Sequence, residues 1–312
     1  MTRKALILGA TGGIGGAVAQ ALFDRGWQIT ALARDPAKGA DRPHYTWVQG
    51  DAMNSSDVTT AAQGAEVIFH GVNPPGYRNW ETTVLPMIDA TITAARDTGA
   101  RILLPGTVYN YDAAKTPVLT ETNPQNATSR KGKIRIDLEQ RLRDAAPEVP
   151  SLILRAGDFF GPGVETGWLK QGMMPQKATT KRITKVAIGH GHSWAYVPDL
   201  AETFAKLLNV ELAPFEALQF QGYFDQSGSD MIDAIRRATG NNRATKQFPW
   251  RVIKLLAPFN RFLREVSDIS GTWHHPMRLD KTRLETLIGP EPHRPLEAAV
   301  AQSLGVGIGT DA

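Results

Sequence analysis

A glycine-spaced segment near the N-terminus has the residue types needed to bind a diphosphate. Gly9, Gly12 and Gly15 recur every three residues, directly after the apolar run Ala5–Leu8 and at the start of a helical pattern. Gly9 permits a tight turn, Gly12 lets the backbone approach a pyrophosphate, and Gly15 lets helix and strand pack closely. The helix N-terminus adds free N–H groups and partial positive charge. In this context the segment predicts a dinucleotide site, and a glycine-rich connector without a ligand is the alternative.

The end of the second predicted strand bears on which dinucleotide is bound. NAD is usually selected by a carboxylate that accepts hydrogen bonds from the ribose hydroxyls, and NADP by an arginine near the 2′-phosphate. Here Arg34 follows the strand directly, and Asp35 comes one residue later. A guanidinium can bind phosphate with two hydrogen bonds, and Lys38 would add a second charge. The segment favours NADP over NAD, and a solvated loop pair is the alternative.

Length and composition limit the class of protein. The chain has 312 residues, 42% hydrophobic and 21% charged, as in globular proteins of about two domains. The absence of cysteine excludes a disulfide scaffold, a cysteine-ligated metal and a cysteine nucleophile. A net charge of +4 is too small and too dispersed to indicate nucleic-acid binding. The N-terminal apolar run is shorter than a signal peptide requires and no run is long enough for a membrane span, so we expect a cytoplasmic protein.

The glycine segment begins a series of strands and helices that must position it. The first two hundred residues alternate between short apolar runs and helical stretches, as parallel strands joined by crossover helices do. The predicted strands are Ala5–Leu8, Gln28–Ala33, Tyr45–Gln49, Glu66–His70, Arg101–Leu104 and Ser151–Arg155. The predicted helices are Ile14–Arg25, Ser56–Gln63, Trp80–Thr98, Arg130–Ala145 and Asp199–Val210. Right-handed crossovers then give an α/β protein with a doubly wound parallel-sheet Rossmann fold.

The later part of the chain predicts a second lobe. After about Phe159 the alternation of strands and helices ends. We expect a Rossmann domain over residues 1–158 and a smaller C-terminal α+β substrate lobe over 159–312, with 195–210 returning to the Rossmann domain.

Three further segments follow the glycine loop in a familiar order. They are Gly50-Asp51-Ala52, Arg155-Ala156-Gly157-Asp158-Phe159-Phe160-Gly161-Pro162-Gly163 and Tyr196-Val197-Pro198-Asp199-Leu200-Ala201. Together with Gly9-Ala10-Thr11-Gly12, these segments resemble the extended and atypical branch of the short-chain dehydrogenase/reductase superfamily, the NAD-dependent epimerase/dehydratase family. The resemblance covers most of residues 1–210 and implies a nicotinamide cofactor.

The resemblance also implies where the cofactor lies. Relatives place an aspartate beside the adenine amino group at the position of Asp51, and the segment 155–163 beside the nicotinamide. With the phosphate-binding candidates included, the predicted cofactor-binding residues are Gly9, Thr11, Gly12, Gly13, Ile14, Gly15, Arg34, Asp51, Ala52, Gly71, Val72, Lys133, Ala156, Gly157 and Phe159.

The catalytic residues of the family are only partly present. Relatives use a tyrosine as acid/base and a lysine four residues later on the same helix face, which lowers the pKa of the tyrosine and holds the nicotinamide ribose. A serine or threonine orients the substrate oxygen. Here Ser129 occupies the tyrosine position, Lys133 matches the lysine, and Pro105 replaces the orienting hydroxyl residue. The usual acid/base is therefore missing.

Three residues remain as catalytic candidates. Thr107 and Tyr109 are the candidates for contacts to a substrate oxygen, and Lys133 for the ribose. The alternatives are a packed aromatic at Tyr109 and a solvated lysine at position 133. We expect an NADP-dependent oxidoreductase or epimerase-like enzyme acting on a small hydroxyl- or carbonyl-bearing substrate. The competing hypothesis is a non-catalytic NADP(H)-binding redox sensor or regulatory protein.

Other patterns give expectations about partners. The motifs His190-x-His192 and His274-His275 lack the spacing of a zinc site, so we expect no metal. The helices Trp80–Thr98 and Arg130–Ala145 resemble the pair that many relatives use to form a homodimer.

A basic amphipathic stretch, Trp250–Arg264, is interrupted by Pro258. Such a stretch can lie on a membrane surface, but we favour a lid or wall of the substrate lobe and expect no membrane partner. Tyr77, Trp80 and Trp168 fall at the carboxyl ends of strands, where substrates of such sheets bind, and ordinary packing is their alternative.

Overall fold

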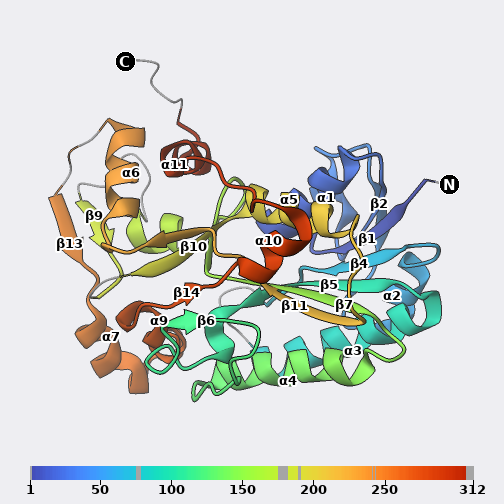
Figure 1. Ribbon diagram of the computed structural model, residues 1–312, viewed down its shortest axis with the longest axis horizontal. Helices are drawn as coiled ribbons and strands as arrows, with labels where there is room; N and C mark the ends of the chain where they lie inside the picture. The colour runs from blue at the N-terminus through green and yellow to red at the C-terminus, as the bar shows by residue number, and fades with distance from the viewer. Residues whose placement is uncertain are drawn as a thin grey trace.

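A parallel sheet forms the centre of the computed structural model, which describes residues 2–74, 79–174, 182–188, 191–240, 242 and 244–306. Its seven strands lie in the order β11-β7-β5-β4-β1-β2-β3, and all neighbours are parallel (Figure 1). The strands are β1 Lys4–Leu8, β2 Gln28–Ala33, β3 Thr46–Gln49, β4 Val67–His70, β5 Arg101–Thr107, β7 Ser151–Ala156 and β11 Phe215–Gln219. The strand order reverses between β1 and β4, which confirms the predicted doubly wound Rossmann fold.

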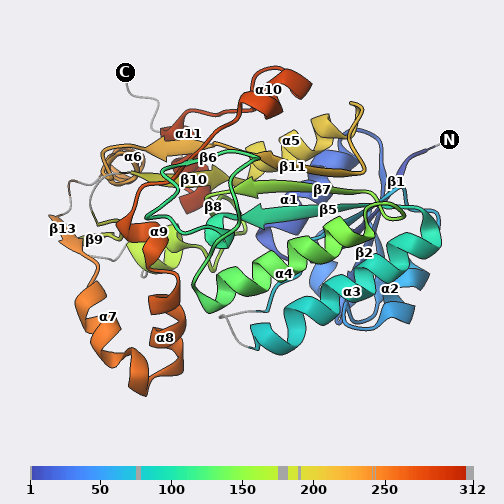
Figure 2. The same ribbon diagram turned by 60° about the horizontal axis from the view of Figure 1, so that its bottom comes forward.

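Helices cover both faces of the sheet (Figures 1 and 2). One face carries α2 Ser55–Ala61, α3 Trp80–Thr98 and α4 Arg130–Ala145, and the other carries α1 Gly13–Phe23, α5 Val197–Leu207 and α10 Thr282–Ile288. Along β1, Ala5 and Ile7 pack under α1 and α5, whereas Leu6 and Leu8 pack under the other layer, as the two-residue period of a strand requires. Coverage on both faces explains why the strands read as continuous apolar runs.

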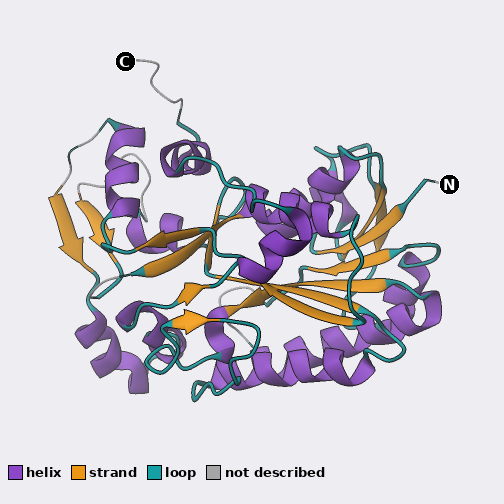
Figure 3. Cartoon of the chain, viewed as in Figure 1, coloured by secondary structure: helices purple, strands orange, loops and turns teal. Residues whose placement is uncertain are grey.

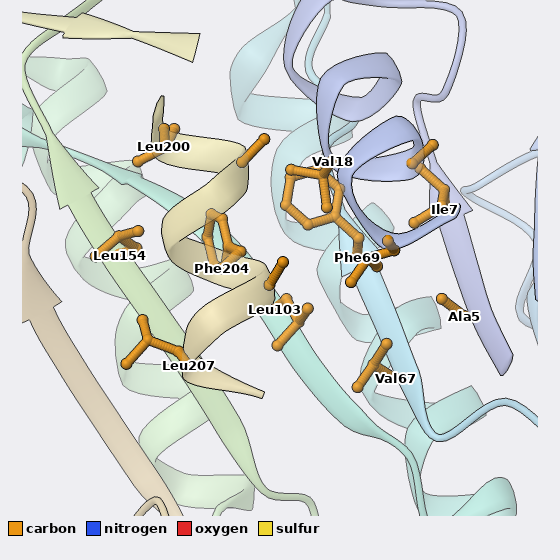
Figure 4. Close-up of a cluster of buried hydrophobic side chains, with 14 of the residues drawn as sticks. Ala5, Ile7, Val18, Val67, Phe69, Leu103, Leu154, Leu200, Phe204 and Leu207 are labelled. Atoms are coloured by element: carbon orange, nitrogen blue, oxygen red, sulfur yellow. The ribbon is translucent and has the colours of Figure 1, made fainter. Parts of the chain in front are cut away.

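The core under α1 and α5 holds the glycine-loop helix against the sheet (Figure 4). Phe204 of α5 meets Phe69 of β4 edge to face, with ring centroids 5.5 Å apart, and Val18 of α1 belongs to the same cluster. All three side chains are buried. Burial of a side chain of this size contributes about 1.5–3 kcal/mol, so the cluster fixes α1 relative to β1 and β4.

A second lobe follows β7 (Figure 3). Its three-stranded sheet contains β8 Asp158–Phe160, β10 His192–Tyr196 and β12 Tyr223–Asp225. Two-stranded sheets join β6 Val118–Leu119 to β14 Arg278–Leu279 and β9 Arg182–Lys185 to β13 Ala244–Gln247. The helices are α6 Asp230–Thr239, α7 Trp250–Leu256, α8 Arg261–Asp268, α9 Gly271–His274 and α11 Leu296–Leu304. Trp168 packs here among Phe248, Trp250 and Trp273.

Within the central sheet, β11 and β5 differ from the sequence expectation. β11 was not predicted, because its sequence contains buried Glu216, which pairs with Arg283. β5 continues past Leu104 through Pro105 to Thr107. Pairing of β5 with β4 ends at Leu103, and a strand paired on one side only can accept a proline.

No helix in the described ranges combines the length and apolar character that crossing a membrane requires. Helices α3 and α4 pack side by side on one face of the sheet. Dimer formation through this pair and a cytoplasmic location stay predictions.

Glu291, between α10 and α11, gives the fold a pH-dependent stability. Its buried carboxyl accepts hydrogen bonds from the backbone amides of Gln221 (2.8 Å) and Gly222 (2.9 Å), and burial raises its pKa to about 7 from 4.5. Between those two values the folded chain holds a proton that the unfolded chain has lost. The contribution to the free energy of unfolding therefore falls, by up to about 3 kcal/mol, as the pH rises through this window.

Glu291→Gln is accordingly expected to reduce the difference in unfolding free energy between pH 4.5 and pH 7. Urea denaturation of both proteins at the two pH values measures this difference. An unchanged difference in the variant would assign the pH dependence to other groups.

Candidate functional site

The loop between β1 and α1 makes a tight turn at the carboxyl edge of the sheet. Gly9 has φ of 91°, and the Gly12 amide donates a hydrogen bond to the Gly9 carbonyl (2.9 Å). A Cβ on Gly15 would lie 2.3 Å from that carbonyl oxygen, and a Cβ on Gly9 would lie 2.7 Å from the carbonyl oxygen of Gly71. Gly9 and Gly15 are therefore required by the fold itself.

Gly12 has a different role. A Cβ there would come no closer than 3.4 Å to another atom, and its backbone is extended (φ −90°, ψ 167°). The fold has room for a side chain at this position, but that side chain would clash with a ligand lying against the backbone. The first turn of α1 has neither an acidic residue nor a side-chain cap, so its amides are available to an anion. These features fit the diphosphate of a dinucleotide.

The loops around the glycine turn come from several elements. Gly71 and Val72 follow β4, and the Gly71 amide donates to the carbonyl of Leu8 (2.9 Å). On the other side, a Cβ on Gly13 would lie 2.7 Å from a methyl group of Val164. The turn thus lies at the point where the strand order reverses, which is where doubly wound sheets bind ligands.

The other predicted cofactor residues lie at the ends of strands. Thr11 and Ile14 flank the glycines, Asp51 and Ala52 follow β3, and Ala156, Gly157 and Phe159 lie at the junction of β7 and β8. A Cβ on Gly157 would lie only 2.1 Å from the carbonyl oxygen of Ser193, so this junction packs directly on β10.

Two cations lie beyond the end of β2. Arg34 and Lys38 are exposed, and neither charged group has a hydrogen-bond or ion-pair partner within the described ranges. The carboxylate of Asp35 accepts a hydrogen bond from the Ala37 amide (3.2 Å) and caps the turn Pro36–Gly39. This edge therefore offers free positive charge, and its nearest carboxylate is engaged by the backbone.

Arg42, which was not predicted as a site residue, contacts the backbone of the glycine loop. Its Nη1 donates a hydrogen bond to the carbonyl of Ala10 (2.6 Å). Arg42 lies in the irregular segment before β3, where no sequence spacing marks it.

Three side chains form a hydrogen-bonded series beside the end of β5. Tyr109, in the 3₁₀ turn Val108–Asn110, has its Oη 3.5 Å from Oδ1 of Asp158 in β8. Oδ2 of Asp158 lies 2.8 Å from Nε2 of His192 in β10. Asp158 and His192 are buried, whereas Tyr109 is half-buried. The series leads from the interior to a phenol at the edge of the site.

The surroundings of His192 fix its orientation. The imidazole stacks on Trp273 with ring centroids 3.6 Å apart and an interplanar angle of 10°. Nδ1 lies 3.3 Å from the carbonyl oxygen of Thr272, which can only accept, so Nδ1 carries hydrogen. The other ring nitrogen, Nε2, is thereby directed at Asp158.

Arg135 places a buried positive charge next to this series. Its Nη2 donates to Oδ1 of Asn73 (3.4 Å), its guanidinium lies over Trp80 (4.9 Å), and its buried Nε has no hydrogen-bond partner in the described structure. Burial lowers the pKa of Arg135, while the attraction of Tyr109 and Glu139 raises it. Because this attraction is mutual, Arg135 favours negative charge on the Tyr109 oxygen.

The predicted pair on α4 lies differently. Ser129 caps the helix, accepting a hydrogen bond from the Gly132 amide (3.1 Å), and Lys133 is exposed without a partner in the described chain. Lys131 and Arg135 point inward instead, and the Lys131 ammonium bonds Glu265 Oε2 at 2.5 Å. The buried pair four residues apart is therefore Lys131 and Arg135, and a ribose contact by Lys133 stays a prediction.

Thr107 shapes the turn that carries Tyr109. Its buried Oγ1 accepts a hydrogen bond from the Tyr109 amide (3.3 Å) and lies 3.5 Å from Oδ1 of Asn110. Of the three catalytic candidates, Thr107 and Tyr109 thus contact each other, whereas Lys133 takes no part in their hydrogen bonds.

The sequence interpretation missed Asp158, His192 and Arg135. An acidic residue within the segment 155–163, which resembles the nicotinamide region, was a signal for Asp158. His192 was considered only as a metal ligand, and its partner in that motif, His190, lies outside the described residues, as does Tyr77. Trp80, also expected near substrate, is buried in the core below α3.

Comparisons with known proteins agree with this geometry. Residues 9–144, which include the glycine loop, match the family model described as NAD(P)H-binding. The 3-diazoavenalumate denitrifying reductase of a Streptomyces species is 29% identical over 187 residues, covering 54% of this chain and 60% of that protein. The chain spans less than two thirds of the length of the curated relatives that it matches.

Solved structures show the same fold over nearly the whole chain. The UDP-glucose 4-epimerase of Bifidobacterium longum, in complex with NAD⁺ and UDP, has a TM-score of 0.75 at 15% identity, covering 96% of this chain and 97% of its own. The UDP-glucuronic acid 4-epimerase of Bacillus cereus, in complex with NAD, has a TM-score of 0.74 at 16% identity, covering 97% and 96%. The chain therefore shares the fold of these NAD-bound epimerases, in agreement with the fold that the resemblance implied.

Proposed function

We propose that this protein is an NADP(H)-dependent reductase that converts a small carbonyl compound to an alcohol, with Tyr109 as the proton donor. The observation that carries the proposal is the series Tyr109–Asp158–His192 at the carboxyl edge of the sheet. Arg135 lies between this series and the predicted cofactor site. It donates a hydrogen bond to Asn73, which follows the predicted cofactor residues Gly71 and Val72, and its charge attracts Tyr109.

The chain's own residues handle the proton, while a bound nicotinamide supplies the hydride. As the substrate oxygen gains negative charge, Tyr109 Oη donates its proton and the alcohol forms. Arg135 stabilises the negative charge left on the phenol oxygen. A single proton then moves from the His192–Asp158 contact to Tyr109, and one proton from solvent replaces it, so the series returns to its starting state.

The residues that would hold the cofactor follow from the same edge of the sheet. Gly12 and the first amides of α1 would bind the diphosphate, and Asp51 would lie beside the adenine. Arg34 and Lys38 offer unpaired positive charge for a 2′-phosphate, which supports NADP over NAD.

Arg34→Ala is expected to weaken NADPH binding about tenfold and to leave NADH binding unchanged, because only NADPH carries the phosphate that the guanidinium would bind. Isothermal titration with both dinucleotides measures this. Arg25→Ala is the matched control, since Arg25 is engaged with Glu202 beyond the end of α1. Equal weakening for both dinucleotides, or tighter binding of NADH by the unmodified protein, would contradict the NADP assignment.

Turnover tests the reductase proposal. NADPH absorbance is followed with a panel of aldehydes and ketones, and oxidation of NADPH is expected with at least one of them. The names of two relatives, the denitrifying reductase and a 2-alkyl-3-oxoalkanoate reductase, support reduction over epimerisation. NADPH binding without turnover across the panel would overturn the reductase and favour a redox sensor.

A further inference from the structure

Helices α7 and α8 form a hairpin that projects from the second lobe (Figure 2). It exposes five large apolar side chains, called here the hairpin surface: Val252 (51% exposed), Leu255 (72%), Leu256 (43%), Phe259 (88%) and Phe262 (55%). The described chain exposes only three other large apolar side chains, all outside this segment. The exposed apolar side chains are thus concentrated at one place.

Helix α7 has two apolar faces where an ordinary surface helix has one. Its inner face packs on the second lobe through buried Trp250, half-buried Ile253 and the following Ala257, and the Trp250 indole donates to the carbonyl of Val186 (2.7 Å). The outer face carries positions 252, 255 and 256, and position 259 in the following 3₁₀ turn continues the same helical spacing. The inner face satisfies the needs of folding, so the outer stripe is left for an external partner.

The hairpin carries four exposed cations, whereas its two carboxylates, both in α8, face Lys131 of α4. Arg251, Lys254, Arg261 and Arg264 are exposed, and positions 244–264 contain no Asp or Glu. In the described structure none of these four cations pairs with a carboxylate, and Arg261 contacts only the amide oxygen of Asn79 (3.2 Å). A partner that complements this surface is both apolar and anionic.

We propose that the hairpin surface binds an anionic membrane surface. Leu255, Phe259 and Phe262 enter the boundary between headgroups and acyl chains, and the cations bind lipid phosphates, as in interfacial amphipathic helices. A projecting hairpin suits a fluid, extended surface, whereas the lid or wall expected from the sequence would direct the outer stripe as well toward the substrate lobe. The inference is independent of the proposed reductase activity.

Co-sedimentation of the full chain with vesicles tests the proposal. Binding to vesicles of equal parts phosphatidylcholine and phosphatidylglycerol is expected to be at least tenfold tighter than to phosphatidylcholine alone, and to weaken with added salt. Phe259→Ser is expected to weaken binding at least tenfold. Lys254→Glu should weaken it about fivefold or more. Lys4→Glu makes the same charge change at the first residue of β1, and should have no effect because β1 lies far from α7 (Figure 1).

Each variant is first shown to retain the Tm of the unmodified protein. No sedimentation with either vesicle, equal binding to both, or full binding by Phe259→Ser would overturn the proposal. Light scattering measures whether the chain forms a dimer in solution. A dimer that Phe259→Ser dissociates, without any vesicle binding, would show that a second copy of the chain covers the hairpin surface instead.

Discussion

Tyr109→Phe is expected to lower kcat for carbonyl reduction at least about 100-fold while NADPH binds as tightly as before. Positioned proton donors contribute about 10²–10⁴-fold to rate, and the substitution removes only the phenol oxygen that bonds Asp158. The ring remains, so the turn after β5 keeps its packing. Steady-state kinetics and isothermal titration of NADPH measure the two quantities separately.

Tyr111→Phe is the matched control for this experiment. It removes the same atom two residues away, but the Tyr111 ring is buried beside Arg155 and its oxygen faces Gln125, outside the series with Asp158. Its kcat should stay within about twofold of the unmodified protein. If Tyr109→Phe retained more than a tenth of the activity, the proton donor would have to be another group.

Gly12→Ala is expected to lower NADPH affinity at least about 100-fold without lowering Tm. The added methyl has room in the protein, with its nearest neighbour 3.4 Å away, and the extended backbone suits alanine. It would instead occupy the space of the diphosphate, whose hydrogen bonds as a charged group are worth about 1.5–3 kcal/mol each. Titration calorimetry and thermal unfolding measure the two effects.

Gly15→Ala provides the contrast. Its methyl would lie 2.3 Å from the Gly9 carbonyl oxygen, so the loss of Tm should accompany any loss of binding. The two variants therefore separate a glycine needed by the ligand from a glycine needed by the fold. Normal NADPH affinity in Gly12→Ala would place the diphosphate elsewhere.

The fold and the glycine loop could be predicted because their signals are local. Apolar runs and glycine spacing reflect contacts within one βα unit, and β1, α1 and β2 lie close to their predicted bounds. β11 was missed because its ion pair between Glu216 and Arg283 puts a charged residue in a buried strand. Sequence hydropathy does not reveal a charge that is neutralised by a residue so distant along the chain.

The acid/base series could not be predicted because its members meet only in the folded chain. Tyr109 lies in the turn after β5, Asp158 in β8 and His192 in β10. The rotation of α4 also depends on a distant contact, the buried ion pair of Glu139 with Arg155 of β7 (2.6 Å). Glu139 lies on the same face as Lys131 and Arg135, so that face points inward, whereas Lys133 was favoured because it matches the lysine of the family motif.

The cations of the hairpin affect the orientation in which the molecule approaches an anionic membrane. The chain contains 35 Lys and Arg and 31 Asp and Glu, so without Arg251, Lys254, Arg261 and Arg264 its formal charges balance. These four cations thus equal the excess positive charge of the chain, and they lie on one projecting hairpin. The field of an anionic bilayer would therefore rotate the approaching molecule until the hairpin faces the bilayer. Raising the ionic strength screens this field and would abolish the orientation.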